Sequence, residues 1–415
     1  MNRPPLRSLD EALQALLAAA QPLAGSDSVS TFDADGRVLA EDLVSALQVP
    51  PQDNSSMDGY VVRSAEIADE GVVLPVSQRI PAGSAALPLQ PGTVARIFTG
   101  APVPEGGDAI VMQEDTEDLG DGRVRICRVP SKGQWIRRSG EDITRGSVVL
   151  ARGDRLGPAA LGLAASIGRD RLQVAPRPRV ALFSTGDELV MPGEVAPEAM
   201  PAGSIYNSNR FFLRSLLLRL GCEVRDFGIV PDQREATVEA LRQAAAGNDL
   251  ILTSGGVSVG EEDHIKPAVQ QLGTLDLWQI AMKPGKPFAH GRIPGTVPGQ
   301  PHEAHFIGLP GNPVSSFVTF LLLVRPFLLK LQGASRVTPE AMQMRANFDW
   351  PRPDRRREFL RVRRDGQGGL ELFPNQSSGV LTSTVWADGL VDVPAGHTFA
   401  AGDMVPFLPL AELLA

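Results

Sequence analysis

A glycine-rich turn, SGGVSVGEEDH (residues 254–264), directly follows the apolar run LILT and carries the residue types of an anion site. Backbone amides and hydroxyls in a turn that opens a helix are suited to bind a phosphate. Asp263 would then supply a hard oxygen ligand for Mg²⁺ shared with that phosphate. The alternative is a tight strand-to-helix connection whose acids only favour the helix N-terminus, and the glycine pattern alone does not decide between them. The groups expected to face the anion belong to Ser254, Gly255, Gly256, Ser258 and Gly260.

A second acidic motif, STGDEL (residues 184–189), ends another predicted strand. It places Thr185, Asp187 and Glu188 at the same edge of the predicted sheet as the glycine turn. Two carboxylates beside a phosphate site indicate metal binding. A helix N-cap with solvated acids is the alternative, and taken alone it explains this motif better.

The loop MKPGKP (residues 282–287) holds Lys283 and Lys286 outside regular helix, because Pro284 and Pro287 exclude helix and Gly285 permits a sharp turn. Both ammonium groups can therefore converge on one oxyanion. As point charges with rotatable donors, they suit a tetrahedral dianion such as phosphate, sulfate or molybdate. A solvated turn is the alternative, and the apolar residues on both sides of the loop weaken it.

Other glycine and proline turns carry weaker signals. GLPGNPVSS (residues 308–316) predicts a strand-to-helix turn in which Pro310 and Pro313 rigidify a close backbone approach, and a purely structural turn fits nearly as well. SSMDGY (55–60), RIFTGAPVP (96–104) and RRSGEDI (137–143) are each ordinary loops when taken singly. The five histidines show no ligand spacing, so we expect no zinc site, and no Walker A or GxGxxG motif is present.

The elements that must position these motifs alternate between apolar strands and helical patterns from 178 to 331. This alternation predicts a doubly wound α/β domain with a parallel sheet and helices on both faces. Each polar motif follows a strand, and the carboxyl ends of such strands form the ligand crevice. The Pro- and Gly-rich stretch 293–304 predicts a surface loop.

The rest of the chain predicts three further parts. Short β-type runs between Gly and Pro residues indicate a β-rich inserted domain at 46–145. It interrupts a helical N-terminal domain (1–45 plus 146–177), whose first helix opens with a capping box of Ser8 and Glu11. After 332 the runs EFLRVRR, GLELFP, VLTST (380–384) and GLVDVP predict a small C-terminal β domain.

Composition excludes several classes of protein. A chain of 415 residues exceeds a single core, and a net charge of −8 argues against nucleic acid as the partner. The apolar run FVTFLLLV (317–324) is stopped by Arg325 and Pro326, so we expect a buried helix and no membrane segment. The two cysteines lie far apart, which favours a reducing, cytoplasmic location.

In this order, the motifs SSMDGY, RIFTGAPVP, QED, RRSGEDI, STGDEL, SGGVSVGEEDH, KPGKP, GLPGNPVS and NQSSG resemble the MoeA family and the E domain of gephyrin. The match runs from the first helix to the last strands. The resemblance implies four domains, an elongated homodimer and an α/β molybdopterin-binding domain shared with molybdopterin adenylyltransferases. It also implies a molybdenumtransferase, which inserts molybdate into adenylylated molybdopterin with release of AMP and the assistance of Mg²⁺. Molybdopterin adenylyltransferase and molybdoenzymes are the protein partners that this step suggests.

The resemblance also implies roles for particular residues. Metal ligands fall on Asp263, Glu188 and Asp232, and molybdate ligands on Lys283, Lys286, Arg356 and Ser378. The Arg-rich stretch DRRREF departs from the family pattern, so the choice among Arg355, Arg356 and Arg357 stays open. Further catalytic positions are Asp58, Asp142 and Thr99, and the substrate-binding set is Ser254, Gly255, Gly256, Ser258, Gly260, Asp232, Arg137, Pro310 and Pro313.

Two alternatives stay open. Molybdopterin adenylyltransferase shares the α/β domain and the substrate, although that enzyme should be the α/β domain alone. A non-enzymatic scaffold of the gephyrin kind is the other, and the lack of an attached linker or partner domain in this chain favours catalysis.

Overall fold

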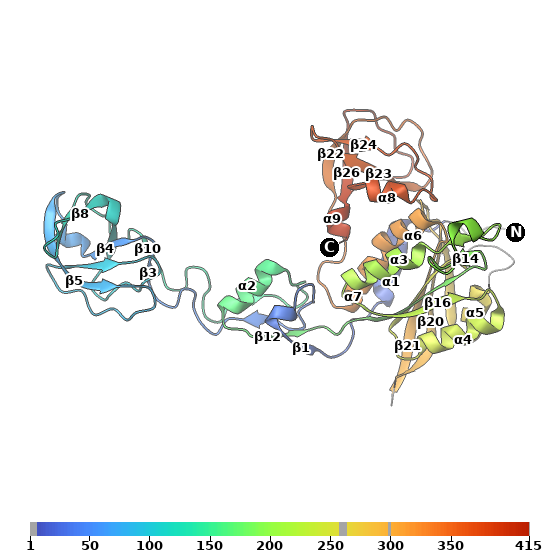
Figure 1. Cartoon of the computed structure of the whole chain (residues 1–415), viewed down its shortest axis with the longest axis horizontal. Coiled ribbons are helices and arrows are strands. Elements are labelled where there is room, and N and C mark those ends of the chain that lie inside the picture. The colour runs from blue at the N-terminus through green and yellow to red at the C-terminus, as the bar shows by residue number, and fades with distance from the viewer. Residues whose placement is uncertain (1–5, 257–263, 298–299, 415) are drawn as a thin grey trace.

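The computed structural model describes residues 6–256, 264–297 and 300–414. The protein is elongated, with a β-rich lobe at one end, a small middle lobe around α2, and an α/β domain with the C-terminal domain beside it at the other end (Figure 1).

The α/β domain is built on a sheet whose strand order is β16-β13-β17-β21-β20-β18. The first four of these strands run parallel, whereas at one edge β20 pairs antiparallel with β21, and β18 pairs antiparallel with β20. The strands are β13 (Arg179–Thr185), β16 (Glu223–Val230), β17 (Leu250–Ser254), β18 (Thr274–Gln279), β20 (Pro287–Val297) and β21 (Gln300–Leu309). The strand alternation predicted from the sequence therefore produces the expected parallel core, and the antiparallel edge was not predicted.

Two apolar cores cover the two faces of this sheet, because successive strand residues point to opposite sides. Val180 and Leu182 lie in one core, and Ala181 and Phe183 lie in the other. The first core includes residues of α1 (Leu9–Ala19), α3 (Asn209–Arg219), α6 (Pro313–Thr319) and α7 (Arg325–Leu331), and the second includes residues of α4 (Arg234–Ala245) and α5 (Ile265–Leu272).

The stretch 293–304 is not the surface loop that its composition predicts. Ile293 pairs with Ala304, and the ladder between β20 and β21 continues to Val297 and Gln300. Glycine is needed in this ladder, since a Cβ on Gly295 would overlap the carbonyl of Ala245 at the end of α4. Gly295 therefore reflects close packing of backbone against backbone within a strand.

The apolar run at 317–324 is confirmed as a buried helix. It includes the π-helical segment η5 (Phe320–Val324) between α6 and α7. By length and composition Pro313–Leu331 is the one described helix that could cross a membrane, but 89% of its apolar window is buried inside the protein. Helix α1 packs against α7 and begins with the predicted capping box, in which Glu11 N–H donates to Ser8 Oγ (3.2 Å) and Ser8 N–H to Glu11 Oε2 (2.8 Å).

The middle lobe contains the predicted helix, and the β-rich lobe at the far end, called the distal lobe below, contains the predicted short strands. The middle lobe holds α2 (Pro158–Ser166) and two ribbons, β1 (Asp27–Ser30) with β12 (Arg171–Val174) and β2 (Leu43–Val44) with β11 (Val148–Leu150). The distal sheet has the order β7-β4-β6-β5-β9-β8, and β3 pairs with β10 beside it. Its strands are β3 (Asn54–Ser55), β4 (Gly59–Val62), β5 (Val72–Ile80), β6 (Val94–Ile97), β7 (Ala109–Met112), β8 (Thr116–Asp118), β9 (Arg123–Ile126) and β10 (Ile136–Arg137).

The C-terminal domain is a closed barrel, because β23 pairs with β24 on one side and with β25 on the other. Its strands are β22 (Met342–Ala346), β23 (Arg357–Arg364), β24 (Gly369–Leu372), β25 (Gly389–Val393) and β26 (Met404–Pro409), and the short helix α9 (Leu410–Leu413) follows. The prediction of a strand at 380–384 is wrong, since helix α8 (Thr382–Trp386) begins there. The Ser383 and Thr384 hydroxyls donate to carbonyls three residues earlier, which favours a helical turn over an extended strand.

Candidate functional site

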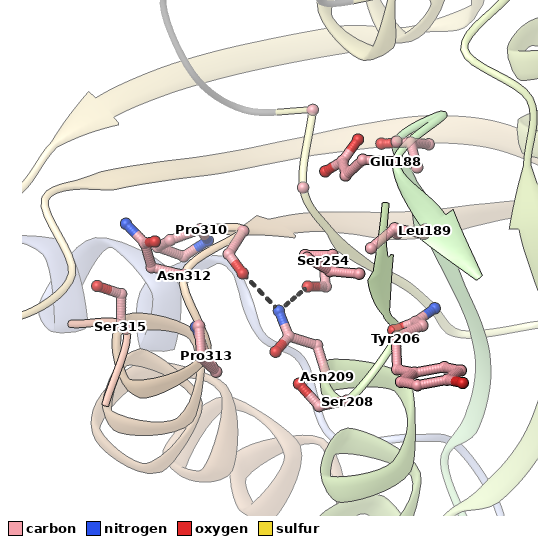
Figure 2. A pocket seen from close by; sticks show the side chains of 18 of the residues that line it. Glu188, Leu189, Tyr206, Ser208, Asn209, Ser254, Pro310, Asn312, Pro313 and Ser315 are labelled. Carbon is pink, nitrogen blue, oxygen red and sulfur yellow. Dashed lines mark hydrogen bonds between the residues drawn. The ribbon is translucent and has the colours of Figure 1, made fainter. Parts of the chain in front are cut away.

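A cleft of about 730 Å³ lies at the carboxyl ends of β13, β17 and β21, where the sequence places its ligand crevice (Figure 2). Seven residues of the predicted site line it: Glu188, Asp232, Ser254, Gly255, Gly256, Pro310 and Pro313. The residues that lead into α3 also line the cleft and were not predicted from the sequence: Tyr206, Asn207, Ser208 and Asn209. The polar run YNSN before a predicted helix was the signal that could have found them.

The glycine turn after β17 needs glycine for two separate reasons. Gly255 and Gly256 have φ values of +94° and +66°, which side-chain-bearing residues rarely adopt. A Cβ on Gly256 would also lie 2.5 Å from Ile265 Cγ1 and 2.9 Å from Thr185 Oγ1. Backbone, not side chain, therefore forms this wall of the cleft, as an anion site requires. Ser258, Gly260 and Asp263 lie outside the described residues.

Asn209 joins three segments of the cleft. Its side-chain amide donates to Ser254 Oγ (2.7 Å) and to the carbonyl of Gly311 (2.7 Å), as the dashed lines in Figure 2 show. Ser254 is only 3% exposed. The start of α3, the end of β17 and the turn before α6 are thus fixed relative to one another.

The acids of the cleft come from the loops after β13 and β16. The Glu188 carboxylate lies over Gly186, where a Cβ would stand 2.6 Å from Glu188 Oε2, and Gly186 has a φ of +139°. The backbone N–H of Asp232 donates to Asp187 Oδ1 (3.2 Å), which holds the two loops together. Among the residues that the structure describes, no group of three or more His, Cys, Asp or Glu could hold a metal ion.

The C-terminal domain supplies the remaining edge of the cleft. Gly379 and Leu381 line it, and the carbonyl of Ser378 accepts a hydrogen bond from Val314 N–H (2.9 Å) at the start of α6. The motif NQSSG (375–379) therefore connects the barrel to the α/β domain at the cleft itself.

The lysine loop borders the cleft through Pro287. Lys283, in β19 (Met282–Lys283), lies beside β23 of the barrel and pairs with Glu358 (2.8 Å) and Asp354 (3.6 Å). Within the described chain Lys286 forms no ion pair.

The three neighbouring arginines differ in their surroundings. Arg357 binds both oxygens of Asp392 (2.6 and 2.5 Å), which raises the pKa of its guanidinium, and Arg355 is exposed. Arg356 binds Asp354, and this side-chain hydrogen bond lowers the pKa of Asp354 to about 2 despite some burial. Because Asp354 also pairs with Lys283, Arg356 is the arginine linked to the lysine loop.

The predicted residues of the β-rich part lie in the distal lobe, away from the cleft of the same chain (Figure 1). Asp58 accepts hydrogen bonds from the backbone N–H (2.7 Å) and hydroxyl (2.8 Å) of Thr99, and these bonds lower its pKa. Arg137, which is exposed, pairs across from Asn54 in the strand that leads to Asp58. Asp142 is exposed near the base of the lobe, where its N–H donates to the carbonyl of Val49 (3.0 Å).

Comparison with known proteins covers the chain in three parts. The matching family models are the MoeA N-terminal region (domain I and II) over residues 7–168, the Probable molybdopterin binding domain over 181–330 and the MoeA C-terminal region (domain IV) over 343–410. A molybdopterin molybdenumtransferase of Haemophilus influenzae is 36% identical over 414 residues, or 98% of this chain and 99% of the relative. The chain belongs to the MoeA family.

Other MoeA comparisons agree with this assignment. The molybdopterin molybdenumtransferase 2 of Mycobacterium tuberculosis is 38% identical over 379 residues, covering 88% of this chain and 90% of the relative. The crystal structure of the molybdopterin biosynthesis moeA protein from Pyrococcus horikoshii OT3 superposes with a TM-score of 0.84 at 26% identity, covering 98% of this chain and all of that one. The family resemblance and the fold class predicted from the sequence are both confirmed.

Proposed function

We propose that this MoeA chain is a molybdopterin molybdenumtransferase, which inserts molybdate into adenylylated molybdopterin and releases AMP. Relatives with that name are 35% to 38% identical over most of the chain. The observation that carries the proposal is the shared edge of the cleft, where a glycine turn suited to phosphate meets the barrel and the lysine loop. One substrate can therefore contact the phosphate-binding and oxyanion-binding groups together.

The backbone at Ser254, Gly255 and Gly256 would bind the pyrophosphate of adenylylated molybdopterin, and the sequence extends this set to Ser258 and Gly260. Pro310 and Pro313 keep the adjacent turn, which also lines the cleft, rigid. Donors held in place before the substrate arrives stabilise charge that develops when the phosphoanhydride breaks, without reorganisation at that moment.

Molybdate would be held by Lys283, Lys286, Arg356 and Ser378. In the described structure Lys283 and Arg356 are paired with Asp354 and Glu358, so a dianion has to compete with these carboxylates. Lys286 has no such competitor within the described residues. Lys286 can therefore bind molybdate without first losing an ion pair.

Mg²⁺ fits the donor set of the cleft. Glu188 and Asp232 provide hard carboxylate oxygens, the ligands that Mg²⁺ prefers, and substrate phosphates and water usually complete its octahedron. With Asp263 from the sequence, these residues would hold the ion, which would neutralise charge on the pyrophosphate.

We further propose that the active protein is a homodimer. Asp58, Thr99, Arg137 and Asp142 lie in a different lobe from the cleft of their own chain (Figure 1). If they act on the same substrate, a second copy has to supply them.

We also expect the enzyme to be cytoplasmic, in agreement with its two free cysteines. Its expected protein partners are a molybdopterin adenylyltransferase and molybdoenzymes.

The assay that tests the function supplies purified protein with adenylylated molybdopterin, molybdate and Mg²⁺ and measures AMP release. A parallel reaction with ATP and molybdopterin tests the adenylyltransferase alternative, for which we expect no pyrophosphate release. Release of pyrophosphate, with no AMP from the adenylylated substrate, would assign the neighbouring step instead.

A further inference from the structure

A buried guanidinium lies beneath the turn that the barrel contributes to the cleft. Arg361, on β23, is only 1% exposed. Its side chain donates to Ser383 Oγ (3.2 Å) and to the carbonyls of Phe359 (3.2 Å) and Ser377 (3.3 Å). All of these acceptors are neutral.

Unlike Arg356 and Arg357, Arg361 has no counter-ion within the described chain. Burial lowers its pKa to about 10, so the side chain remains charged at neutral pH. Burying a cation without a counter-ion is unfavourable in general, because the charge loses its hydration. Arg357, which lies at the start of the same strand, avoids that cost by binding Asp392.

The segment that Arg361 holds is the one that reaches the cleft. The backbone N–H of Arg361 donates to Gln376 Oε1 (2.9 Å), and Gln376 Nε2 donates to the Arg361 carbonyl (3.0 Å). The guanidinium itself holds Ser377, whose neighbour Ser378 accepts the hydrogen bond from α6. Loss of the guanidinium would therefore loosen the turn at the point where it joins the α/β domain.

The charge of Arg361 also affects the net charge at this edge of the cleft. Lys283 and Arg356 are balanced by Asp354 and Glu358, which leaves little net charge from these four residues. A cation in a poorly hydrated environment acts over a longer range than one in water, since the effective dielectric constant is lower. Arg361 supplies such an uncompensated positive charge behind the turn.

We infer that Arg361 is a positioning residue of the molybdate site, which fixes the 375–379 turn and makes the cleft edge attractive to a dianion. This inference rests on the proposed function. It predicts that removing the guanidinium weakens molybdate binding more than it affects nucleotide binding or the chemical step.

The experiment compares wild type with Arg361→Gln, which removes the charge, and Arg361→Lys, which keeps the charge but loses the three-acceptor geometry. Arg363→Met is the matched control, since Arg363 lies on the same strand, exposed and paired with Glu371. Sodium molybdate and AMP are titrated separately by calorimetry into each full chain, and KM for molybdate and kcat are measured. Thermal melts establish which variants fold.

We expect Arg361→Gln to raise the KM and Kd for molybdate about ten-fold or more, with Arg361→Lys between it and wild type. AMP affinity and kcat at saturating molybdate should stay near wild type, and Arg363→Met should resemble wild type throughout. If the Gln variant does not fold, the Lys variant and Ser383→Ala take its place, each with a raised molybdate KM.

An unchanged molybdate KM in the folded variants would overturn the inference, as would an equal loss of AMP affinity and kcat. Failure of the proposed function is a separate result, because it would appear in the wild-type protein as absent AMP release before any variant is compared.

Discussion

At the scale of single residues, the two lysines of the lysine loop (residues 282–287) have different surroundings, although the sequence predicts the same role for both. Lys283 is a partner of Glu358, which is only 2% exposed and is otherwise bound to Trp350 Nε1 (2.9 Å). Lys286 has no ion pair among the described residues. Replacing Lys283 therefore leaves a buried carboxylate without its cation, and replacing Lys286 does not.

We predict that Lys283→Ala lowers the free energy of unfolding by about 1–3 kcal/mol, because the buried Glu358 loses its counter-ion. Lys286→Ala should change it by less than about 0.5 kcal/mol. Both variants should lose molybdate affinity. Denaturant unfolding and molybdate calorimetry on the same samples measure the two effects, and wild-type molybdate affinity in Lys286→Ala would remove the loop from the site.

Two buried histidines should make the stability of the α/β domain sensitive to acid. His290 (6% exposed) and His305 stack against each other with ring centroids 5.7 Å apart, and burial lowers the pKa of each from 6.5 to about 4. The charged groups near them are Arg292, Glu303 and Asp249, and His302 is adjacent. In the folded state both rings are neutral at pH values where the unfolded chain is already protonated.

Stability should therefore be fully present above pH 6.5 and fall as the pH drops from about 6.5 to about 4, by up to about 1.4 kcal/mol per pH unit for each histidine. His290→Phe, which keeps an aromatic ring next to His305 and Phe327, should reduce this slope. Melting temperatures across that pH range test the prediction. An equal slope in the variant would mean that other groups cause the acid loss.

At the scale of elements, the cleft depends on how closely backbones approach one another. Gly256 lies against Ile265 and Thr185 at a positive φ, whereas a Cβ on Gly379 would have no neighbour within 4 Å. Replacement by alanine should therefore be damaging at Gly256 and tolerated at Gly379, although both glycines line the same cleft.

We predict that Gly256→Ala loses most AMP release and destabilises the protein by about 1–3 kcal/mol, because of backbone strain and overlap. Gly379→Ala should stay near wild type, and Gly379→Glu should fold normally but lose molybdate affinity through charge repulsion. Turnover and melting temperature measured together distinguish these outcomes. Normal turnover in Gly256→Ala would show that the turn does not need its close approach.

Much of this arrangement was predictable from the sequence, since strand periodicity placed STGDEL, SGGVSV and GLPGNP at the same sheet edge. The failures have physical causes. Composition could not show that 293–304 continues a ladder, because Gly295 is required there by the neighbouring α4 and not by a turn. Nor could it show that helix α8 begins at Thr382, since the barrel closes through β23 and β25 without this segment. The ion pairs of Lys283 and the role of Asn209 arise from residues distant in the chain.

At the scale of the whole molecule, the barrel and the α/β domain share one apolar core that includes Phe359, Leu390, Leu410 and Leu413. A chain cut after 331 would expose this core, so point variants at the cleft test the two-domain site more cleanly than truncation. The division of the chain at 45, 145, 177 and 331 remains a prediction, which limited proteolysis can test.

Homodimerisation makes a specific prediction about mixed variants. At limiting molybdate, Asp58→Asn inactivates the distal lobe and Lys286→Ala leaves the cleft without bound molybdate, so each homodimer should be nearly inactive. Co-expression forms heterodimers with one intact composite site, which should restore about a quarter of wild-type turnover. If both residues acted within one chain, the mixture would be as inactive as its components.

The proposed function requires molybdate and the adenylylated substrate to react together in the cleft between the barrel and the α/β domain. The most direct measurement is AMP release by the wild-type protein from adenylylated molybdopterin and Mg²⁺, with and without molybdate, repeated with Lys286→Ala. We predict release that depends on molybdate in wild type and requires much higher molybdate in the variant. Release of AMP at the same rate without molybdate, or an identical molybdate dependence in both proteins, would contradict the account.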